Sequence, residues 1–150
     1  MMTGELRTEW LYDLSATLAP WHDIGDFGGG KRRIVPVTGG RVEGPHLSGD
    51  VLPFGADFFV ERTDDVLVLD VRAIVRTGDG AEIYAFYPGL SHGQSLGPFG
   101  DLPEGERYFR TTPRFETGSE KYAWLNRILT VGVGWLEPPN SVRYKVYAVL

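Results

Sequence analysis

Apolar and polar residues alternate most clearly in the middle of the chain. Residues 66–76 are rich in β-branched side chains, and from Asp70 onward the two kinds of residue alternate strictly, as on a half-buried β-strand. Two glycines within residues 77–80 supply the positive φ angles of a tight turn, and residues 81–87 alternate again. The pattern predicts a β-hairpin. Its first strand is expected to bury one face, made of Leu67, Leu69, Val71, Ala73 and Val75.

Shorter strand-like segments recur along the rest of the chain, separated by turns that contain glycine or proline. Pro113 marks an edge or a bend in one of them, because proline cannot donate to a strand ladder. The one helical window covers residues 119–126, with Thr117 or Ser119 as its cap. The further strands are expected over residues 9–18, 32–37, 40–51, 57–61, 107–115, 129–135 and 142–150.

Eight or nine short strands with regular turn signals are typical of a sandwich or a barrel. The last strand is long and alternates well, so it would be a hazardous free edge in an open sheet, and this favours closure. We therefore expect an all-β fold: a single antiparallel β-barrel of about eight strands over residues 1–150, lipocalin-like, with minimal helix. Residues 88–106, rich in glycine and proline, are expected to form a mobile loop near the barrel mouth.

Charge and composition narrow the range of partners. Twenty acidic and fifteen basic residues give a formal charge of −5, which disfavours contact with the phosphates of nucleic acid. The chain has no cysteine, which excludes disulfides and thiolate metal sites and suits a reducing compartment. The N-terminal segment lacks the pattern of a signal peptide, and no apolar stretch approaches the ~20 residues that span a bilayer. We expect a cytoplasmic protein that binds neither nucleic acid nor membranes.

Standard catalytic motifs are not found in the sequence. Neither H-E-x-x-H nor G-x-S-x-G is present, and Gly28–Lys31 lacks the rest of a phosphate-binding loop, so it is interpreted as a flexible connection. No two of the three histidines have metal-ligand spacing, and no metal is expected. A metal site formed by His46, His92 and scattered carboxylates is the alternative that the residues leave open.

Charged and phenolic side chains on the predicted strands are the first candidate chemistry. Asp70 and Arg72 lie two residues apart and therefore project from one face of their strand. Tyr84 on the paired strand, and Arg110 further along, join them if that face lines the barrel interior. Burial would raise the pKa of the carboxyl there and the arginines would lower it, which suits a general acid or base. The alternative is a solvent-facing pair of Asp70 and Arg72, with the valines of the strand in the core.

Asp57 is the second candidate for acid or base chemistry. It precedes Phe58-Phe59, and burial among aromatic groups would raise its pKa, although a capping or turn aspartate fits the position as well. Segment 110–118 places two arginines and a glutamate beside aromatic residues, which fits either a salt-bridged turn or a site for an anionic or phenolic group. Trp124 and Asn126 are candidates for a pocket mouth, although a tryptophan is more often in the core.

At these residues the sequence resembles the domain-of-unknown-function family 3237, also filed as an uncharacterised protein family. The resemblance covers nearly the whole chain, because the turn at residues 79–81 and the terminal residues 146–149 fit it too. The family pattern often has a tryptophan or a similar group after the aspartate of its G-A-D segment, where this chain has Phe58. The blocks that carry the resemblance are residues 40–45 (GRVEGP), 108–118 (YFRTTPRFETG) and 122–126 (YAWLN).

The resemblance implies a compact antiparallel barrel similar to allene oxide cyclase and dirigent proteins, often oligomeric. Barrels of that type hold an apolar small molecule and direct its cyclisation or isomerisation without a cofactor. For some relatives the implied reaction closes an oxygen heterocycle by adding a hydroxyl to an alkene. We therefore expect a homo-oligomer that needs no cofactor. The resemblance supplies no catalytic set, so the residue roles rest on the pattern alone.

The leading hypothesis is a cofactor-independent cyclase or isomerase of a small apolar, phenolic or polyketide-like substrate. A carboxyl would transfer the proton, arginine and tyrosine would hold developing negative charge, and the barrel would fix the reacting geometry. The expected catalytic residues are Asp57, Asp70, Arg72, Tyr84 and Arg110. The expected substrate-binding residues are Glu43, Phe59, Thr112, Glu116, Trp124 and Asn126. The alternatives are a non-catalytic carrier of small lipophilic molecules and a structural homo-oligomer without a ligand. An ionisable cluster that faces the interior would favour the enzyme over the carrier.

Overall fold

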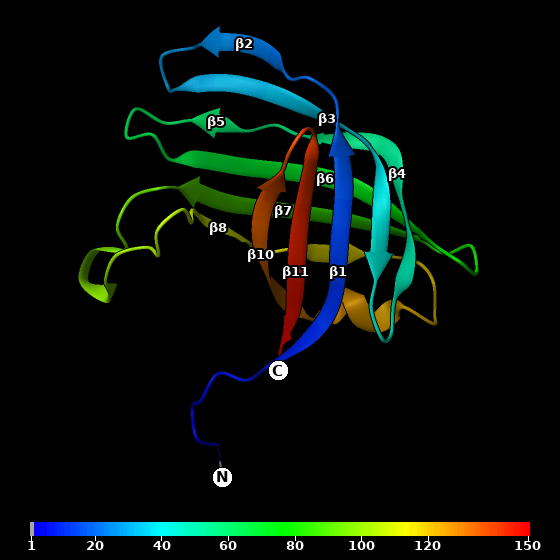
Figure 1. Cartoon of the computed structure of the whole chain (residues 1–150). Coiled ribbons are helices and arrows are strands. Elements are labelled where there is room, and N and C mark those ends of the chain that lie inside the picture. The colour runs from blue at the N-terminus through cyan, green and yellow to red at the C-terminus, as the bar shows by residue number, and fades with distance from the viewer. Residues whose placement is uncertain (1) are drawn as a thin grey trace.

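The computed structural model of the protein describes residues 2–150 (Figure 1). Eight strands form the wall of a barrel: β1 (Thr8–Leu18), β3 (Lys31–Glu43), β4 (Ser48–Asp57), β6 (Leu67–Thr77), β7 (Glu82–His92), β8 (Tyr108–Thr111), β10 (Leu129–Glu137) and β11 (Ser141–Val149). Three shorter strands extend this wall: β2 (His22–Asp26), β5 (Val60–Glu61) and β9 (Arg114–Glu116). The helical turns within these residues are two 3-10 segments, η1 (Gly97–Phe99) and η2 (Ala123–Arg127).

The eight wall strands form a closed ring of antiparallel pairs. From β1 the ring runs through β3, β4, β6, β7, β8, β10 and β11, and the β1–β11 ladder closes it. Figure 1 shows the first strand in blue beside the last in red, with β10 next to it. The last strand is therefore not a free edge. The expected all-β fold, an antiparallel barrel of about eight strands with almost no helix, is confirmed.

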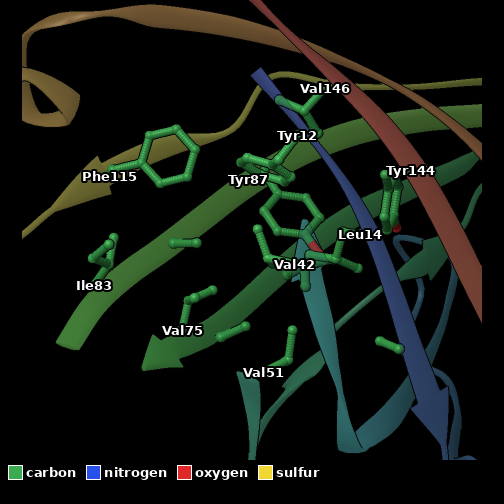
Figure 2. Packing of buried hydrophobic residues seen from close by; sticks show 14 of the residues in the cluster. Tyr12, Leu14, Val42, Val51, Val75, Ile83, Tyr87, Phe115, Tyr144 and Val146 are labelled. Atoms are coloured by element: carbon green, nitrogen blue, oxygen red, sulfur yellow. The ribbon is translucent and has the colours of Figure 1, made fainter. Parts of the chain in front are cut away.

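Alternation along the strands places the apolar side chains inside the barrel. On β6, the inward residues Leu69, Val71, Ala73 and Val75 are buried, and the alternate positions from Asp70 to Arg76 are mostly exposed. This alternation confirms the predicted hairpin and its buried face. Leu67 belongs to this face and is partly exposed. Figure 2 shows the side chains that fill the interior, from six of the wall strands and β9. The labelled ones are Tyr12, Leu14, Val42, Val51, Val75, Ile83, Tyr87, Phe115, Tyr144 and Val146.

The turn between β3 and β4 lies later in the chain than the sequence indicates. We expected a break at residues 38–40, yet β3 continues through these residues to Glu43. Gly40 is needed for close approach rather than for a turn, because a Cβ there would overlap the carbonyl oxygen of Ser15 on β1. The register with β1 shifts beside it, between Thr17 and Leu18, so the strand bends and the barrel wall turns a corner.

Two irregular segments also differ from expectation. The loop is shorter than residues 88–106, because Pro88–His92 continue β7 and pair with both β6 and β8. The expected helix at 119–126 is the single 3-10 turn η2, which begins after Tyr122 without a side-chain cap. β2 was not predicted; it pairs with β3 outside the ring. Among residues 2–150 no helix is both long and apolar enough to cross a membrane.

Candidate functional site

Asp57 lies on the inner face of the barrel wall. Its register partners are Val35 on β3 and Val71 on β6, and Val71 in turn lies opposite Tyr87 on β7. Residues directly opposite in antiparallel strands project from the same face. Val71 and Tyr87 are buried in the interior, so the Asp57 side chain points into the barrel with them. Asp57 is itself partly exposed.

The surroundings of Asp57 raise its pKa to about 6, mainly because burial disfavours the charged carboxylate. The Asp57 Oδ1 atom accepts a hydrogen bond from the backbone N–H of Asp70 at 3.0 Å, and this favours the charged form. The nearby Asp70 carboxylate acts in the opposite direction and adds to the raised pKa. A carboxyl poised near neutral pH is populated in both protonation states, as a group that gives and takes a proton must be.

Tyrosine side chains occupy the interior near Asp57. The rings of Tyr87 and Tyr144 meet edge to face with centroids 5.6 Å apart (Figure 2). Burial raises the pKa of both phenols, and the negative charge of Asp57 raises them further. Both hydroxyls are therefore neutral donors at physiological pH. The interior at Asp57 thus combines one titratable carboxyl with two phenols that stay protonated.

The residues next to Asp57 on the inner face are less fully buried than the core. Val35 and Leu67, which face inward, are partly exposed there. Arg33 lies two residues before Val35 on β3, and Glu61 lies opposite Leu67, so both project from the same inner face. The Arg33 Nη1 atom lies 2.6 Å from Glu61 Oε2, and this hydrogen bond lowers the pKa of the Glu61 carboxyl. We call this region the open end of the barrel.

Aromatic side chains flank the open end. The guanidinium of Arg33 lies 5.2 Å from the ring centroid of Trp21, and Trp21 meets the buried Phe59 edge to face at 6.0 Å. Phe59, which the sequence analysis assigned to substrate binding, is therefore placed two residues beyond Asp57 at this end. The open end offers an aromatic surface beside the cations of Arg33 and Lys31 and the carboxylate of Glu61, next to the titratable carboxyl.

Asp70, Arg72 and Tyr84 lie together, but on the outer face of the wall. Arg72 Nε is 3.7 Å from Asp70 Oδ1, and Arg72 Nη1 donates to the Tyr84 hydroxyl at 3.1 Å. The side chains of Asp70 and Arg72 are 52% and 56% exposed. The expectation that this face lines the interior is wrong, because the valines on the other face of β6 fill the interior instead. The sheet itself separates Asp57 from the other predicted catalytic residues.

Arg110, Thr112 and Glu43 also lie outside the interior. Arg110 pairs across the sheet with Val133 and Leu90, donates to the carbonyl of Phe109, and lies 5.2 Å from the Tyr108 ring centroid. Thr112 is exposed just after β8. Glu43 is bound to Arg41 at 2.7 Å, with 62% of its side chain exposed. None of the three contacts Asp57.

Two surface grooves hold the remaining predicted residues. One groove, of about 480 Å³, is lined by Tyr84, Glu116 and Asn126 together with parts of β6 and β7. Asn126 is fixed there by hydrogen bonds with the backbone of Thr117. The second groove, of about 670 Å³, contains Trp124, whose ring meets that of His46 edge to face. The predicted binding residues are thus distributed over at least three separate places.

Sequence reasoning missed most neighbours of Asp57. Tyr87 continues the inward series of Ile83 and Ala85, and Tyr144 lies on the inner face of the regular last strand, so alternation alone could have found both. Arg33 and Glu61 meet through the β3–β5 pairing, which leaves no local signal. Within residues 2–150, no cluster of three or more histidine and carboxylate side chains could hold a metal ion.

The fold is shared with several solved structures. A β-barrel-like protein from Acinetobacter baumannii aligns over 99% of both chains, with a TM-score of 0.88 and 35% identity. A conserved protein of unknown function from Rhodopseudomonas palustris aligns over 99% of this chain and 100% of its own, with a TM-score of 0.88 and 37% identity. An enzyme from Penicillium herquei has the same fold, with a TM-score of 0.73 at 22% identity over 100% and 98% of the two chains.

Sequence comparison gives the family. A UPF0311 protein of Rhodopseudomonas palustris is 39% identical over 137 residues, which are 87% of this chain and 89% of that protein. The hydroalkoxylation enzyme phnH of Penicillium herquei is 25% identical over 132 residues, 88% of this chain and 74% of that protein. The model of the family DUF3237, described as a protein of unknown function, matches residues 6–149. The chain therefore belongs to the DUF3237 family.

Proposed function

We propose that this protein is a cofactor-independent cyclase that adds a hydroxyl group to an alkene within one small phenolic substrate, with Asp57 as the acid and base. The observation that carries the proposal is the inward-facing Asp57 carboxyl, whose pKa is raised to about 6 beside two neutral phenols. The distant similarity to a hydroalkoxylation enzyme supports the same reaction class. The substrate would enter at the open end, against Trp21 and Phe59.

The proposed reaction is an isomerisation that needs no oxidant or reductant. The protonated Asp57 carboxyl gives its proton to one alkene carbon, and the substrate hydroxyl oxygen forms a bond to the other. The hydroxyl proton then returns to the carboxylate, so one C–O and one C–H bond replace the O–H and C=C π bonds. Tyr87 and Tyr144, as neutral hydrogen-bond donors, would stabilise the negative charge that the Asp57 carboxylate gains when it gives up its proton. The barrel contributes by holding the hydroxyl close to the alkene.

Conversion of ortho-prenylated and ortho-allyl phenols by the purified chain tests this proposal. The cyclic ether has the mass of its substrate, so chromatography with mass detection reports the reaction as a new peak of unchanged mass. Asp57→Asn keeps the size and the hydrogen-bond acceptor of the side chain but cannot supply the proton, and it is expected to lower turnover about 10²–10⁴-fold. The matched control is Asp70→Asn, which removes a carboxyl from the outer face and should change turnover only a few-fold.

Two results would contradict the cyclase proposal. One is wild-type conversion no faster than in buffer across the whole set of phenols. The other is full activity in Asp57→Asn while its circular dichroism matches the wild type. Either result would mean that the raised pKa of Asp57 serves no catalytic purpose.

A non-catalytic carrier is the second candidate, and the composition of the inner face favours it. With Asp70, Arg72 and Arg110 on the outer side, most inward residues are apolar. A carrier would bind the same phenols without converting them, and Asp57→Asn would bind them at least as tightly as the wild type, because a buried charge is removed. Fluorescence titration with a saturated analogue, which cannot cyclise, separates binding from turnover.

A further inference from the structure

The groove of about 670 Å³ that contains Trp124 is formed by two segments far apart in the sequence. One wall is the turn from β3 into β4, residues 44–48, and the other is the beginning of η2, residues 121–124 (Figure 1). Ser48 begins β4 and Asp57 ends it, so the groove and the proposed catalytic carboxyl lie at opposite ends of one strand. We call this place the Trp124 groove.

Both walls of the Trp124 groove are held in place by contacts within the chain. Gly44 lies so close to β1 that a Cβ there would overlap the carbonyl oxygen of Leu11. On the other wall, the Tyr122 hydroxyl donates to Asp79 Oδ1 at 3.0 Å, and Lys121 Nζ donates to Asp79 Oδ2 at 2.8 Å. The groove is therefore preformed, and a ligand need not spend binding energy on ordering it.

The charge of the groove is that of a cation. Its lining, all of it within residues 2–150, includes one ammonium group, Lys121, and no carboxylate. This composition stands out in a chain whose formal charge is −5. The carboxylates directly beside lining residues in the sequence are Glu43, which lies 2.7 Å from Arg41, and Glu120, and neither lines the groove. An anion in the groove would therefore meet a cation without a facing carboxylate.

Lys121 keeps hydrogen-bond donors for a second acceptor. Its side chain is 67% exposed, and Asp79 accepts from one of its three N–H groups. Hydrogen bonds from Lys121, Thr77 and Tyr122 hold the pKa of the Asp79 carboxyl well below its ordinary value. Asp79 is thus bound from three sides and stays ionised. A ligand carboxylate can bind Lys121 without displacing it.

Aromatic rings and a hydroxyl complete the groove. Trp124 is partly exposed, and its ring meets that of the exposed His46 edge to face, with centroids 6.4 Å apart. Ser48 supplies a hydroxyl and Pro45 an apolar surface. A planar apolar group can pack on such rings while a polar end of the same molecule reaches the donors.

We propose that the Trp124 groove binds an aromatic monocarboxylate, a planar ring that bears one carboxylate group. The ring packs against Trp124 and His46, and the carboxylate accepts hydrogen bonds from Lys121 and Ser48. A volume of about 670 Å³ accommodates one small ligand of this kind. The inference does not depend on the proposed cyclase activity at Asp57, and either can fail without the other.

NMR titration of the ¹⁵N-labelled full chain with trans-cinnamate tests the inference. The indole N–H signal of Trp124, identified by its loss in Trp124→Phe, is expected to shift and saturate with a dissociation constant of about 1 mM or lower. Cinnamamide keeps the ring and lacks the charge, and propionate keeps the charge and lacks the ring. Each is expected to bind at least about 10-fold more weakly than cinnamate.

Lys121→Met removes the ammonium and keeps most of the apolar length of the side chain. It is expected to weaken cinnamate binding at least about 10-fold and to change cinnamamide binding by no more than about 2-fold. Lys145→Met is the matched control, because Lys145 also lies beside a carboxylate, 3.4 Å from Asp13, and does not line the groove. It should bind cinnamate as the wild type does. Circular dichroism establishes that each variant is folded.

Several results would overturn the inference. One is the absence of a saturable shift of the Trp124 signal up to about 10 mM cinnamate, well above the expected dissociation constant. Others are equal affinities for cinnamate and cinnamamide, wild-type affinity in Lys121→Met, and weaker binding in Lys145→Met. Saturable shifts centred on Trp21 instead would place the ligand at the open end and contradict it as well. The wild-type ratio of the two affinities decides the question even if Lys121→Met does not fold.

Discussion

Asp57 and Asp70 are residues of the same type on paired strands, yet the barrel wall separates their side chains. The backbone N–H of Asp70 donates to the carboxylate of Asp57 at 3.0 Å, so the two residues are direct neighbours. Asp57 points inward, next to buried Val71 and Tyr87, and its pKa is raised to about 6. Asp70 points outward, is half exposed, and lies beside Arg72.

The difference teaches that strand parity, rather than residue type or proximity, decides which carboxyl is available for chemistry. A step of one residue along a strand exchanges the interior of the barrel for water. Inside, burial makes the ionised form costly and moves the pKa toward neutrality. Outside, a half-exposed ion pair such as Asp70–Arg72 contributes little to stability or chemistry. The predictions below test this contrast between the two faces.

The largest effect is expected from placing a charge on the inner face of β6. Val71→Asp buries an unpaired carboxylate in the apolar core and should destabilise the domain by about 4 kcal/mol or more, enough to unfold much of it. Ile74→Asp, on the outer face of the same strand, should cost only about 1 kcal/mol. Urea denaturation followed by tryptophan fluorescence gives both values. Equal losses in the two variants would contradict the assignment of the faces.

The next effect concerns Asp57 itself and depends on pH. Its pKa in the folded chain, about 6, exceeds the ordinary value of 3.8, so the native state holds this proton more tightly than the unfolded state. As the pH rises from about 4 to about 6 the unfolded state ionises first, and native stability falls by on the order of 2–3 kcal/mol. Asp57→Asn cannot ionise and should escape this loss.

Asp57→Asn is therefore expected to be more stable than the wild type above pH 7 and equally stable below about pH 4. Thermal unfolding at a series of pH values measures the difference. Asp70→Asn provides the control on the outer face. A variant that is less stable than the wild type at pH 8 would show that the ionised carboxylate of Asp57 stabilises the fold rather than opposing it.

The smallest effect is expected on the outer face. Arg72→Ala removes the contacts to Asp70 and Tyr84, all of which are solvent-exposed, and should change the free energy of unfolding by no more than about 1 kcal/mol. Salt screens exposed pairs, so the change should shrink further in about 1 M sodium chloride. A loss of several kcal/mol in this variant would mean that the outer cluster is a structural centre of the barrel.

Alternation made most of the fold predictable from the sequence. The hairpin of β6 and β7 and the last strand follow from residues 66–87 and 142–150, where apolar residues recur at every second position. β2 could not be found this way, because residues 22–26 are mostly polar and lie outside the barrel ring. The continuation of β3 through Gly40 depends on close approach to β1, a contact between segments far apart in the sequence.

The candidate site was predictable only in part. Sequence placed Asp57 among aromatic residues and placed Asp70, Arg72 and Tyr84 on one face, and both placements agree with the structure. The buried face predicted for this strand, which contains Val71, already implied that Asp70 and Arg72 point outward, so the assignment of that pair to the interior conflicted with the predicted face. The contacts at the open end depend on which strands pair, and local sequence does not contain that information.

Carbon-13 NMR titration of the Asp57 carboxyl tests the central claim most directly, because it needs no substrate. The Asp57→Asn variant identifies the resonance by its loss. We expect a midpoint near pH 6, set mainly by burial. Asp70→Asn should move that midpoint slightly down, because the charge of Asp70 contributes to the raised pKa. A midpoint near pH 4, the ordinary value for aspartate, would place Asp57 in contact with bulk water and contradict the account.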